Sequence, residues 1–200
     1  MRKTANLKLL SQPTKNYKAN KNIKLGYHTY FLSLAHSDLS GYNVCPMANR
    51  LSKKENNKNK SNCSSVCVGY NGKAAIFKNV MKGRIRKTKL FYEDRQQFMQ
   101  LLIKDIFNAI EFSKEHGKIC TFRLNAYSDI KWENIPINHN NKEYKNIFEL
   151  FSEYKFYDYT KIAGRKTPKN YEITYSYYGD NKYFRKILKN DWSTSTCRNL

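Results

Sequence analysis

Apolar residues recur at helical spacing in one long segment of the chain. The segment 93–116 carries a broad apolar stripe that comprises Phe98, Met99, Leu102, Ile103, Ile106, Ala109 and Ile110. Residues three and four positions apart lie on the same face of a helix, so this spacing predicts an amphipathic helix with one buried face. Gly117 follows the segment, and a glycine at this place is typical of a helix end.

Shorter segments are rich in aromatic and β-branched residues, which is typical of strands. They predict strands over residues 26–36, 119–126, 155–161 and 170–179. Helical spacing returns between and after them and predicts shorter helices near residues 73–82, 142–154 and 180–190. Strands and helices therefore alternate along most of the chain.

This alternation predicts the α/β fold class with a parallel sheet, either a partial β/α barrel of the TIM type or an open doubly wound sheet. In both architectures, functional groups gather on the loops that follow the carboxyl ends of the strands. We expect one domain over residues 25–200, because a chain of 200 residues can bury one sizeable core.

Two basic segments lie outside this pattern. Residues 1–24 are polar and lack periodicity, so we expect an N-terminal arm that is poorly ordered or lies over the domain. Residues 49–60 are rich in lysine and asparagine and predict a flexible basic insertion within the domain.

The whole chain is strongly basic, with 37 Lys and Arg against 16 Asp and Glu and a formal net charge of +21. Such a charge attracts nucleic acid or another polyanion. The joint excess of lysine and asparagine also fits an AT-rich coding sequence, so the alternative is a solvated basic surface without a partner. The candidate phosphate contacts lie in one basic stretch that comprises Lys82, Arg84, Arg86, Lys87 and Lys89.

The hydropathy of the chain argues against a membrane protein. The N-terminus lacks the apolar run of a signal peptide, and no apolar stretch is long enough to span a bilayer. We therefore expect a soluble cytoplasmic protein with no membrane partner. In a reducing cytoplasm, the five cysteines of the chain would act as thiols or metal ligands rather than as disulfides.

Three of the cysteines, Cys45, Cys63 and Cys67, form the candidate metal site. Thiolates select zinc or iron–sulfur clusters, and three thiolates leave one coordination position open for chemistry. His36 could supply a fourth ligand and close a structural zinc site. The alternative is that these cysteines are small buried thiols without a metal, which is our main interpretation for Cys120 and Cys197.

A second group of polar residues is predicted near the carboxyl ends of the strands. Arg123 and Asn125 lie two positions apart on one predicted strand and so share a face. A buried arginine needs an anion, which Asp129, Asp158 or a bound carboxylate or phosphate could supply. With Lys161, these residues form a candidate pocket for a polar or anionic substrate, and a structural ion pair is the alternative.

Several motifs together resemble a known family. The segments "SGYNVCPMA", "CSSVCVG", "RIRKTKLFYEDRQQFMQLLIKDI", "RLNAYSDIKWE" and "FYDYTK" follow one another in the order of the phage "gene product 88" domain family. The resemblance covers about residues 25–190. It implies a phage or prophage protein that works in the cytoplasm of the host cell.

The resemblance also bears on the cysteines and on the end of the chain. Members of the family keep the three cysteines close together, which implies that residues 49–60 are an insertion into a common site. The family pattern continues past the last residue here, so we expect that the C-terminal segment is truncated or altered.

The place of the cysteines is similar to that in radical S-adenosylmethionine enzymes, which hold a [4Fe–4S] cluster after the first strand of a partial β/α barrel. Their C-x3-C-x2-C spacing is absent from this chain. This likeness favours an iron–sulfur cluster over zinc.

Two functions thus stay open, and neither specifies a reaction or an oligomeric state. The first is a phage-type iron–sulfur protein with a polar substrate pocket at the strand ends. The second is a basic nucleic-acid-binding accessory protein with structural zinc or no metal. A third hypothesis is that the protein is a degenerate member of the family without activity.

Overall fold

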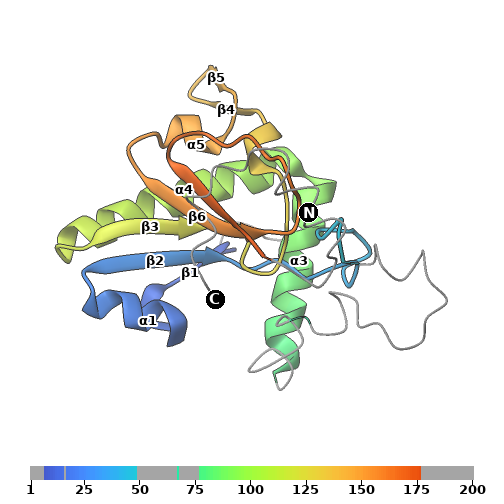
Figure 1. The fold of residues 1–200 in the computed structure, drawn as a ribbon, viewed down its shortest axis with the longest axis horizontal. Helices are drawn as coiled ribbons and strands as arrows, with labels where there is room; N and C mark the ends of the chain where they lie inside the picture. Colours follow the sequence, from blue (N-terminus) through green and yellow to red (C-terminus); the bar gives the residue numbers. More distant parts are fainter. Residues whose placement is uncertain (1–6, 16, 49–66, 68–76, 177–200) are drawn as a thin grey trace.

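The computed structural model describes residues 7–15, 17–48, 67 and 77–176. These residues include a five-stranded sheet (Figure 1). Its strands, in spatial order, are β1 (Leu10–Ser11), β2 (Tyr27–Leu32), β3 (Ile119–Arg123), β6 (Lys155–Thr160) and β7 (Tyr171–Tyr175). The β1–β2 pair is antiparallel, whereas the other three neighbouring pairs are parallel. The expected α/β class is confirmed as a mixed α/β fold, but the described strands form an open sheet and no closed barrel.

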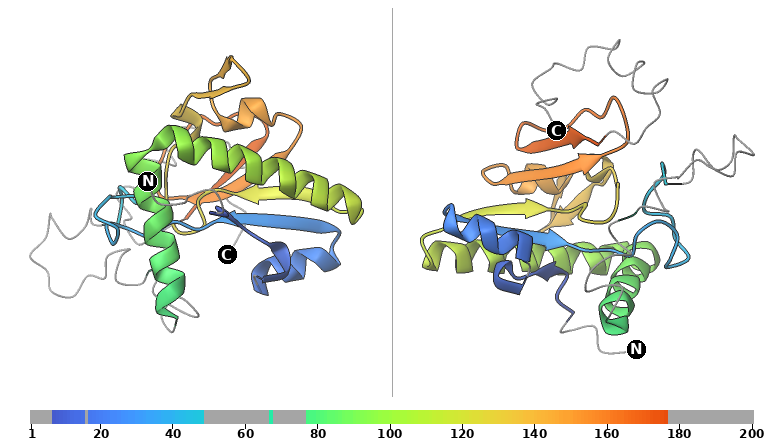
Figure 2. Two further views of the ribbon diagram at one scale, coloured as in Figure 1. Left: turned by 180° about the vertical axis from the view of Figure 1, so that it is seen from behind. Right: turned by 60° about the horizontal axis from the view of Figure 1, so that its bottom comes forward.

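Helices lie on both faces of this sheet. The described helices are α1 (Tyr17–Lys24), α3 (Lys78–Glu93), α4 (Arg95–Glu115), the short α5 (Ile147–Leu150) and the 3-10 turns η1 (Pro13–Lys15) and η3 (Trp132–Asn134). Figure 2 shows α4 running along one face. On β2, Tyr30 meets α4 through Ser113, whereas Thr29 points the other way and meets Asn22 of α1. α1 therefore covers β2 on the face opposite α4.

The long helix α4 contributes more residues to the core than any other described element, as its spacing predicts. All seven residues of the predicted apolar stripe are buried. At its N-terminus, the Asp94 side chain accepts a hydrogen bond from the Gln97 backbone N at 2.9 Å, and Gly117 follows its end with φ of 61°. The sheet residues that face α4 include Tyr30, Phe122 and Phe156, whose neighbouring ring centroids lie 5.8 and 5.1 Å apart.

The predicted helix over 142–154 is wrong for most of its length. Residues 137–144 form a hairpin of β4 (Ile137–His139) and β5 (Lys142–Tyr144), and only α5 is helical. Asn140 and Asn141 have φ of 50° and 59°, which is the left-handed conformation that a tight hairpin turn requires. The apolar residues that follow this turn have helical spacing, which led to the prediction of a helix over the whole segment.

The N-terminal residues that the structure describes pack on the rest of the domain. Residues 7–15 and 17–24 include β1 and α1, and Leu9 and Leu10 are buried in the core. The Asp105 carboxylate of α4 accepts hydrogen bonds from both of their backbone N atoms, at 2.6 and 3.0 Å. This part of the expected arm thus belongs to the domain, because its apolar residues complete the sheet edge.

Other boundaries differ more mildly from the predictions. The helix expected near 73–82 is α3, which extends to Glu93 and so includes the basic stretch. The insertion at 49–60 and the helix expected over 180–190 lie outside the described residues. None of the described helices is long and apolar enough to cross a bilayer.

Candidate functional site

The carboxyl ends of β2, β3, β6 and β7 lie at one edge of the sheet, beside α3 (Figure 1). Parallel strands place their following loops together at such an edge. Four of the five predicted pocket residues have their side chains in the polar network that forms here: Arg123, Asn125, Asp129 and Asp158.

Asp158 of β6 ties the end of β3 to β7, with its side chain fully buried. Its Oδ2 accepts hydrogen bonds from the backbone N atoms of Leu124 and Asn125, at 3.1 and 3.0 Å, and from the Tyr171 hydroxyl at 3.3 Å. Its Oδ1 lies 3.4 Å from Nε of Arg123. Burial raises the pKa of Asp158 to about 7, against the opposing effects of the Arg123 charge and of these hydrogen bonds.

Asn125 organises the loop that follows β3. Its amide oxygen accepts hydrogen bonds at 2.8, 3.0 and 3.1 Å from the Ser128 hydroxyl, the Ile130 backbone N and the Trp132 indole N. Its amide nitrogen donates to the Ile130 carbonyl and to the Tyr171 hydroxyl, at 2.9 and 3.3 Å. Both ends of the amide are therefore occupied within the protein, which fixes the loop's path.

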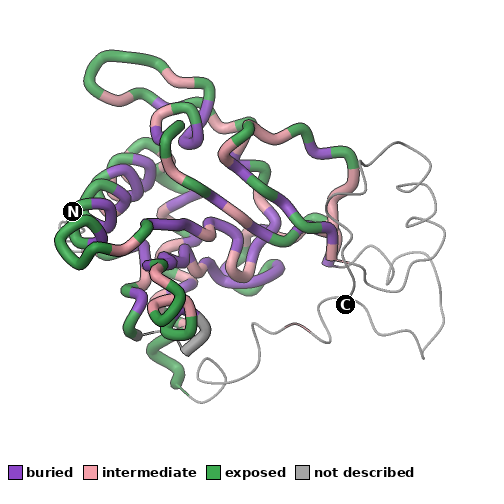
Figure 3. Tube along the Cα trace, turned by 60° about the vertical axis from the view of Figure 1, so that its left-hand side comes forward, coloured by how far each residue is buried: buried purple, intermediate pink, exposed green. Residues whose placement is uncertain are grey.

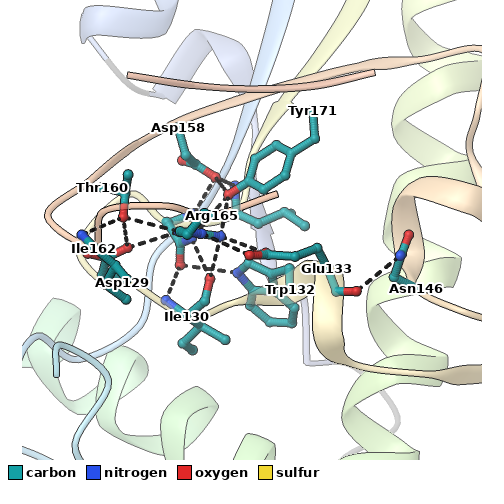
Figure 4. A network of polar contacts seen from close by, with 12 residues as sticks. Asp129, Ile130, Trp132, Glu133, Asn146, Asp158, Thr160, Ile162, Arg165 and Tyr171 are labelled. Carbon is teal, nitrogen blue, oxygen red and sulfur yellow. Dashed lines mark hydrogen bonds and ion pairs between the residues drawn. The ribbon is translucent and has the colours of Figure 1, made fainter. Parts of the chain in front are cut away.

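Arg165, which the sequence analysis does not single out, stands at the centre of the network (Figure 4). Its side chain is fully buried, and Nε and Nη2 donate to the two carboxylate oxygens of Glu133 at 2.9 and 2.7 Å. Nη1 lies 3.0 Å from Asp129 Oδ1 and 3.3 Å from Thr160 Oγ1. This two-pronged geometry joins the loop after β6 to the loop after β3.

Asp129 faces Arg165 from the loop after β3. It accepts hydrogen bonds from the Thr160 hydroxyl at 2.7 Å and from the Lys161 backbone N at 2.8 Å. Burial raises the pKa of Asp129, against the effects of these hydrogen bonds and the nearby cations. Lys161 itself points to the end of β7, where its Nζ lies 3.2 Å from both Oγ and the carbonyl oxygen of Ser176.

The observed partners of these predicted pocket residues are other protein groups. The contacts match the alternative of a structural ion-pair network, and a substrate-binding role stays a prediction. Two cavities of the described part lie elsewhere. One, of about 230 Å³, is at the opposite edge of the sheet beside Cys120, and the other, of about 390 Å³, lies against α3.

The predicted metal ligands are only partly described. Cys45 follows β2 and is partly exposed, with its Sγ 3.5 Å from the Tyr127 carbonyl oxygen, and Cys67 is also partly exposed. Cys63 lies outside the described residues. Within the described part, no three His, Cys, Asp or Glu side chains are grouped as a metal would require, and His36 is fully buried. The three-cysteine metal site therefore stays a prediction.

The basic stretch divides into anchored and exposed residues on α3. The Arg84 guanidinium lies 3.9 Å from the centre of the Tyr127 ring, and Nζ of Lys87 donates to the Leu9 carbonyl at 2.6 Å. Burial lowers the pKa of Lys87 to about 8, partly offset by the Asp105 charge. The exposed members, with the preceding lysine, form what we name the α3 basic stripe: Lys78, Lys82, Arg86 and Lys89.

A model of the family described as gene product 88 matches residues 3–197, which is nearly the whole chain. The protein belongs to the gene product 88 family. The resemblance expected from the motifs is thereby confirmed. No curated protein and no solved structure gives a significant match to the chain.

The sequence analysis of this gene product 88 protein did not identify several members of the network, among them Glu133, Arg165 and Tyr171. Arg165 lies in the turn between two predicted strands, "AGRKTP", where one cation among 37 Lys and Arg carries no signal by itself. The one feature that could have pointed to a buried ion pair is that this residue is an arginine, because arginine suits buried bidentate pairs better than lysine does. Its acidic partners lie 32 and 36 positions away, so no local spacing could reveal them.

Proposed function

We propose that this gene product 88 protein binds nucleic acid and that the α3 basic stripe contacts the phosphates. The observation that carries the proposal is the arrangement of four exposed cations along one helix. Among the residues that the structure describes, no ion pair involves any of the four.

The spacing of the α3 basic stripe suits a linear polyanion. Its members are separated by four, four and three positions, so they lie on one face of α3. At about 1.5 Å of rise per residue, the stripe is about 16 Å long. Double-stranded DNA presents one negative charge per about 1.7 Å of axis, so several phosphates lie within reach of such a stripe.

The rest of α3 is held firmly, which favours binding over a merely solvated helix. Arg84 and Lys87 are used for contacts with Tyr127 and Leu9, and the Thr88 hydroxyl accepts a hydrogen bond from the Ala35 backbone N at 2.8 Å. The exposed cations therefore project from a fixed scaffold, and little backbone order has to be gained on binding.

The test is a titration of fluorescently labelled duplex DNA against salt. If all four cations contact phosphates, log K should fall against log salt with a slope of about −3.6, which is a loss of about 150-fold between 50 and 200 mM. In the variant Lys82→Gln/Arg86→Gln/Lys89→Gln, the slope should become shallower by about 2.7. Glutamine preserves helix propensity, so α3 should persist.

A matched control removes the same charge elsewhere. The variant Lys104→Gln/Lys131→Gln/Lys169→Gln changes three exposed lysines outside α3 and should keep the wild-type slope. Equal slopes for the wild type and the α3 variant would disprove a role for the stripe. Absence of binding at low salt would disprove the function as a whole.

A second candidate is a metal centre held by Cys45, Cys63 and Cys67, with an iron–sulfur cluster as the first choice and zinc as the alternative. It is supported by the position of Cys45, partly exposed in the loop at the carboxyl edge of the sheet. Iron, sulfide and zinc analysis after anaerobic purification tests it. If this candidate is correct, the variant Cys45→Ser/Cys67→Ser should lose the metal that the wild type carries, whereas Cys120→Ser should keep that metal. A wild-type protein that contains neither iron nor zinc would refute the candidate.

A further inference from the structure

The face of the sheet opposite α4 carries an aromatic and cationic surface that the proposed function does not use. Buried residues alternate with more exposed ones along β6, as the burial colours of the strands illustrate (Figure 3). Lys155, Tyr157 and Tyr159 therefore point away from the buried Phe156 and Asp158. By register, Tyr157 is beside Glu172 of β7. We name the surface of Arg123, Lys155, Tyr157 and Tyr159 the open sheet face.

The described helices leave this surface accessible. α1 packs on β2 and α4 packs on the other face of the sheet. Tyr159 is 49% exposed, and Tyr157 is partly exposed. A half-exposed large ring on an inner strand of the sheet is a feature that nothing in the described fold requires.

The cation of Arg123 is fixed among the rings. Its guanidinium carbon lies 5.0 Å from the centre of the Tyr159 ring, 5.7 Å from that of Tyr157 and 5.6 Å from that of Phe31. The guanidinium is also paired with a carboxylate, since Asp158 Oδ1 lies 3.4 Å from Arg123 Nε. With 16% of its side chain exposed, Arg123 offers the edge of a planar cation beside aromatic faces and loses little further side-chain freedom on binding.

The spacing of the two tyrosines suits unpaired bases. Residues two apart on a strand are separated by about 6.6 Å. Stacked bases in a duplex are only about 3.4 Å apart along each strand, so the two rings suit bases that have left the stack. Proteins that bind single strands use such aromatic platforms together with nearby cations for the backbone.

We infer that the open sheet face binds single-stranded nucleic acid, with unpaired bases stacked on Tyr157 and Tyr159 and with Arg123 and Lys155 beside the phosphates. The inference shares its ligand with the proposed function and in that respect rests on it, but it concerns a different surface and a different part of the nucleotide. Charge favours this occupant, because the chain is strongly basic and Arg123 stands among the rings.

The surface is less suited to a protein partner that needs an apolar patch. Its margin is formed by the exposed Glu172 and Thr174, and Lys155 has 63% of its side chain exposed. The Lys155 Nζ is 3.6 Å from a Glu172 oxygen, but both side chains are so exposed that the pair is weak and a phosphate can replace the carboxylate.

The experiment compares a labelled 15-nucleotide oligo-dT with a duplex, by fluorescence anisotropy on the full chain at one low salt concentration. The variant Tyr157→Thr/Tyr159→Thr removes both rings and keeps strand propensity. It should weaken oligo-dT binding at least about tenfold and change duplex binding less than about twofold. Tyr157→Phe/Tyr159→Phe keeps the rings and should bind oligo-dT like the wild type.

The results separate this inference from the proposed function. Unchanged oligo-dT binding in the threonine variant would overturn the inference, while loss of duplex binding in the α3 variant would still support the proposed function. Equal losses of affinity for the duplex and for oligo-dT in the threonine variant would also overturn the inference, because the rings would then not distinguish unpaired bases. If the threonine variant melts several degrees lower with unchanged binding, the rings pack on another part of the chain and the inference is wrong. Tyr159→Thr alone, at the more exposed position, repeats the test if the double variant does not fold.

Discussion

Replacing Arg165 by methionine tests whether the network at the carboxyl edge holds the fold together. The side chain of Arg165 is fully buried, and those of Asp129 and Glu133 are at most 10% exposed. Methionine has a similar length and fills the space, but it leaves both carboxylates without their cation.

The expected loss follows from this burial. Breaking a buried ion pair by removing one partner costs about 3–5 kcal/mol, because the remaining charge stays desolvated. For a chain of this size, each kcal/mol lowers the melting temperature by about 2–4 °C, so we expect a decrease of about 6–20 °C. Urea denaturation and thermal melts followed by circular dichroism at neutral pH measure both quantities.

Two further variants make the reasoning specific. Arg165→Met combined with Asp129→Asn and Glu133→Gln removes the unpaired charges and should recover a large part of the loss. Lys166→Met, at the exposed neighbouring position, should change the free energy of unfolding by less than about 0.5 kcal/mol. A loss below about 1 kcal/mol for Arg165→Met would refute the view that the network stabilises the loops and would leave Arg165 available for a ligand.

Two predictions concern buried titratable groups. The pKa of Asp158 is about 7 when folded, against about 3.9 in an unfolded chain, so the folded state holds a proton that the unfolded state releases. The contribution of Asp158 to stability should therefore fall as the pH rises from about 4 to 7, and Asp158→Asn should flatten that part of the pH profile of urea unfolding; identical profiles would contradict the assignment. Burial raises the pKa of Cys120 to about 12, so its thiol should react with a disulfide reagent only after unfolding, and Cys120→Ser should leave the reaction of the native protein unchanged.

The sequence by itself determined the parts of the fold whose pattern is local. The seven apolar residues of the stripe are buried on α4, and β2, β3, β6 and β7 lie within the predicted segments. Side-chain direction follows from residue spacing within one helix or strand, so these predictions need no knowledge of the partner surface. The hairpin of β4 and β5 was missed because two asparagines in the left-handed conformation outweigh the helical spacing around them.

The tertiary structure alone decided what the polar residues do. The sequence brought Arg123, Asn125, Asp129 and Asp158 to the strand ends, but it could not show that Arg165 and Glu133 complete their network. It predicted five cations on one basic stretch, and packing against Tyr127 and Leu9 removed Arg84 and Lys87 from the exposed set. The physical reason is the same in each case: the free energy of a charge depends on its burial and its neighbours, and those neighbours come from distant parts of the chain.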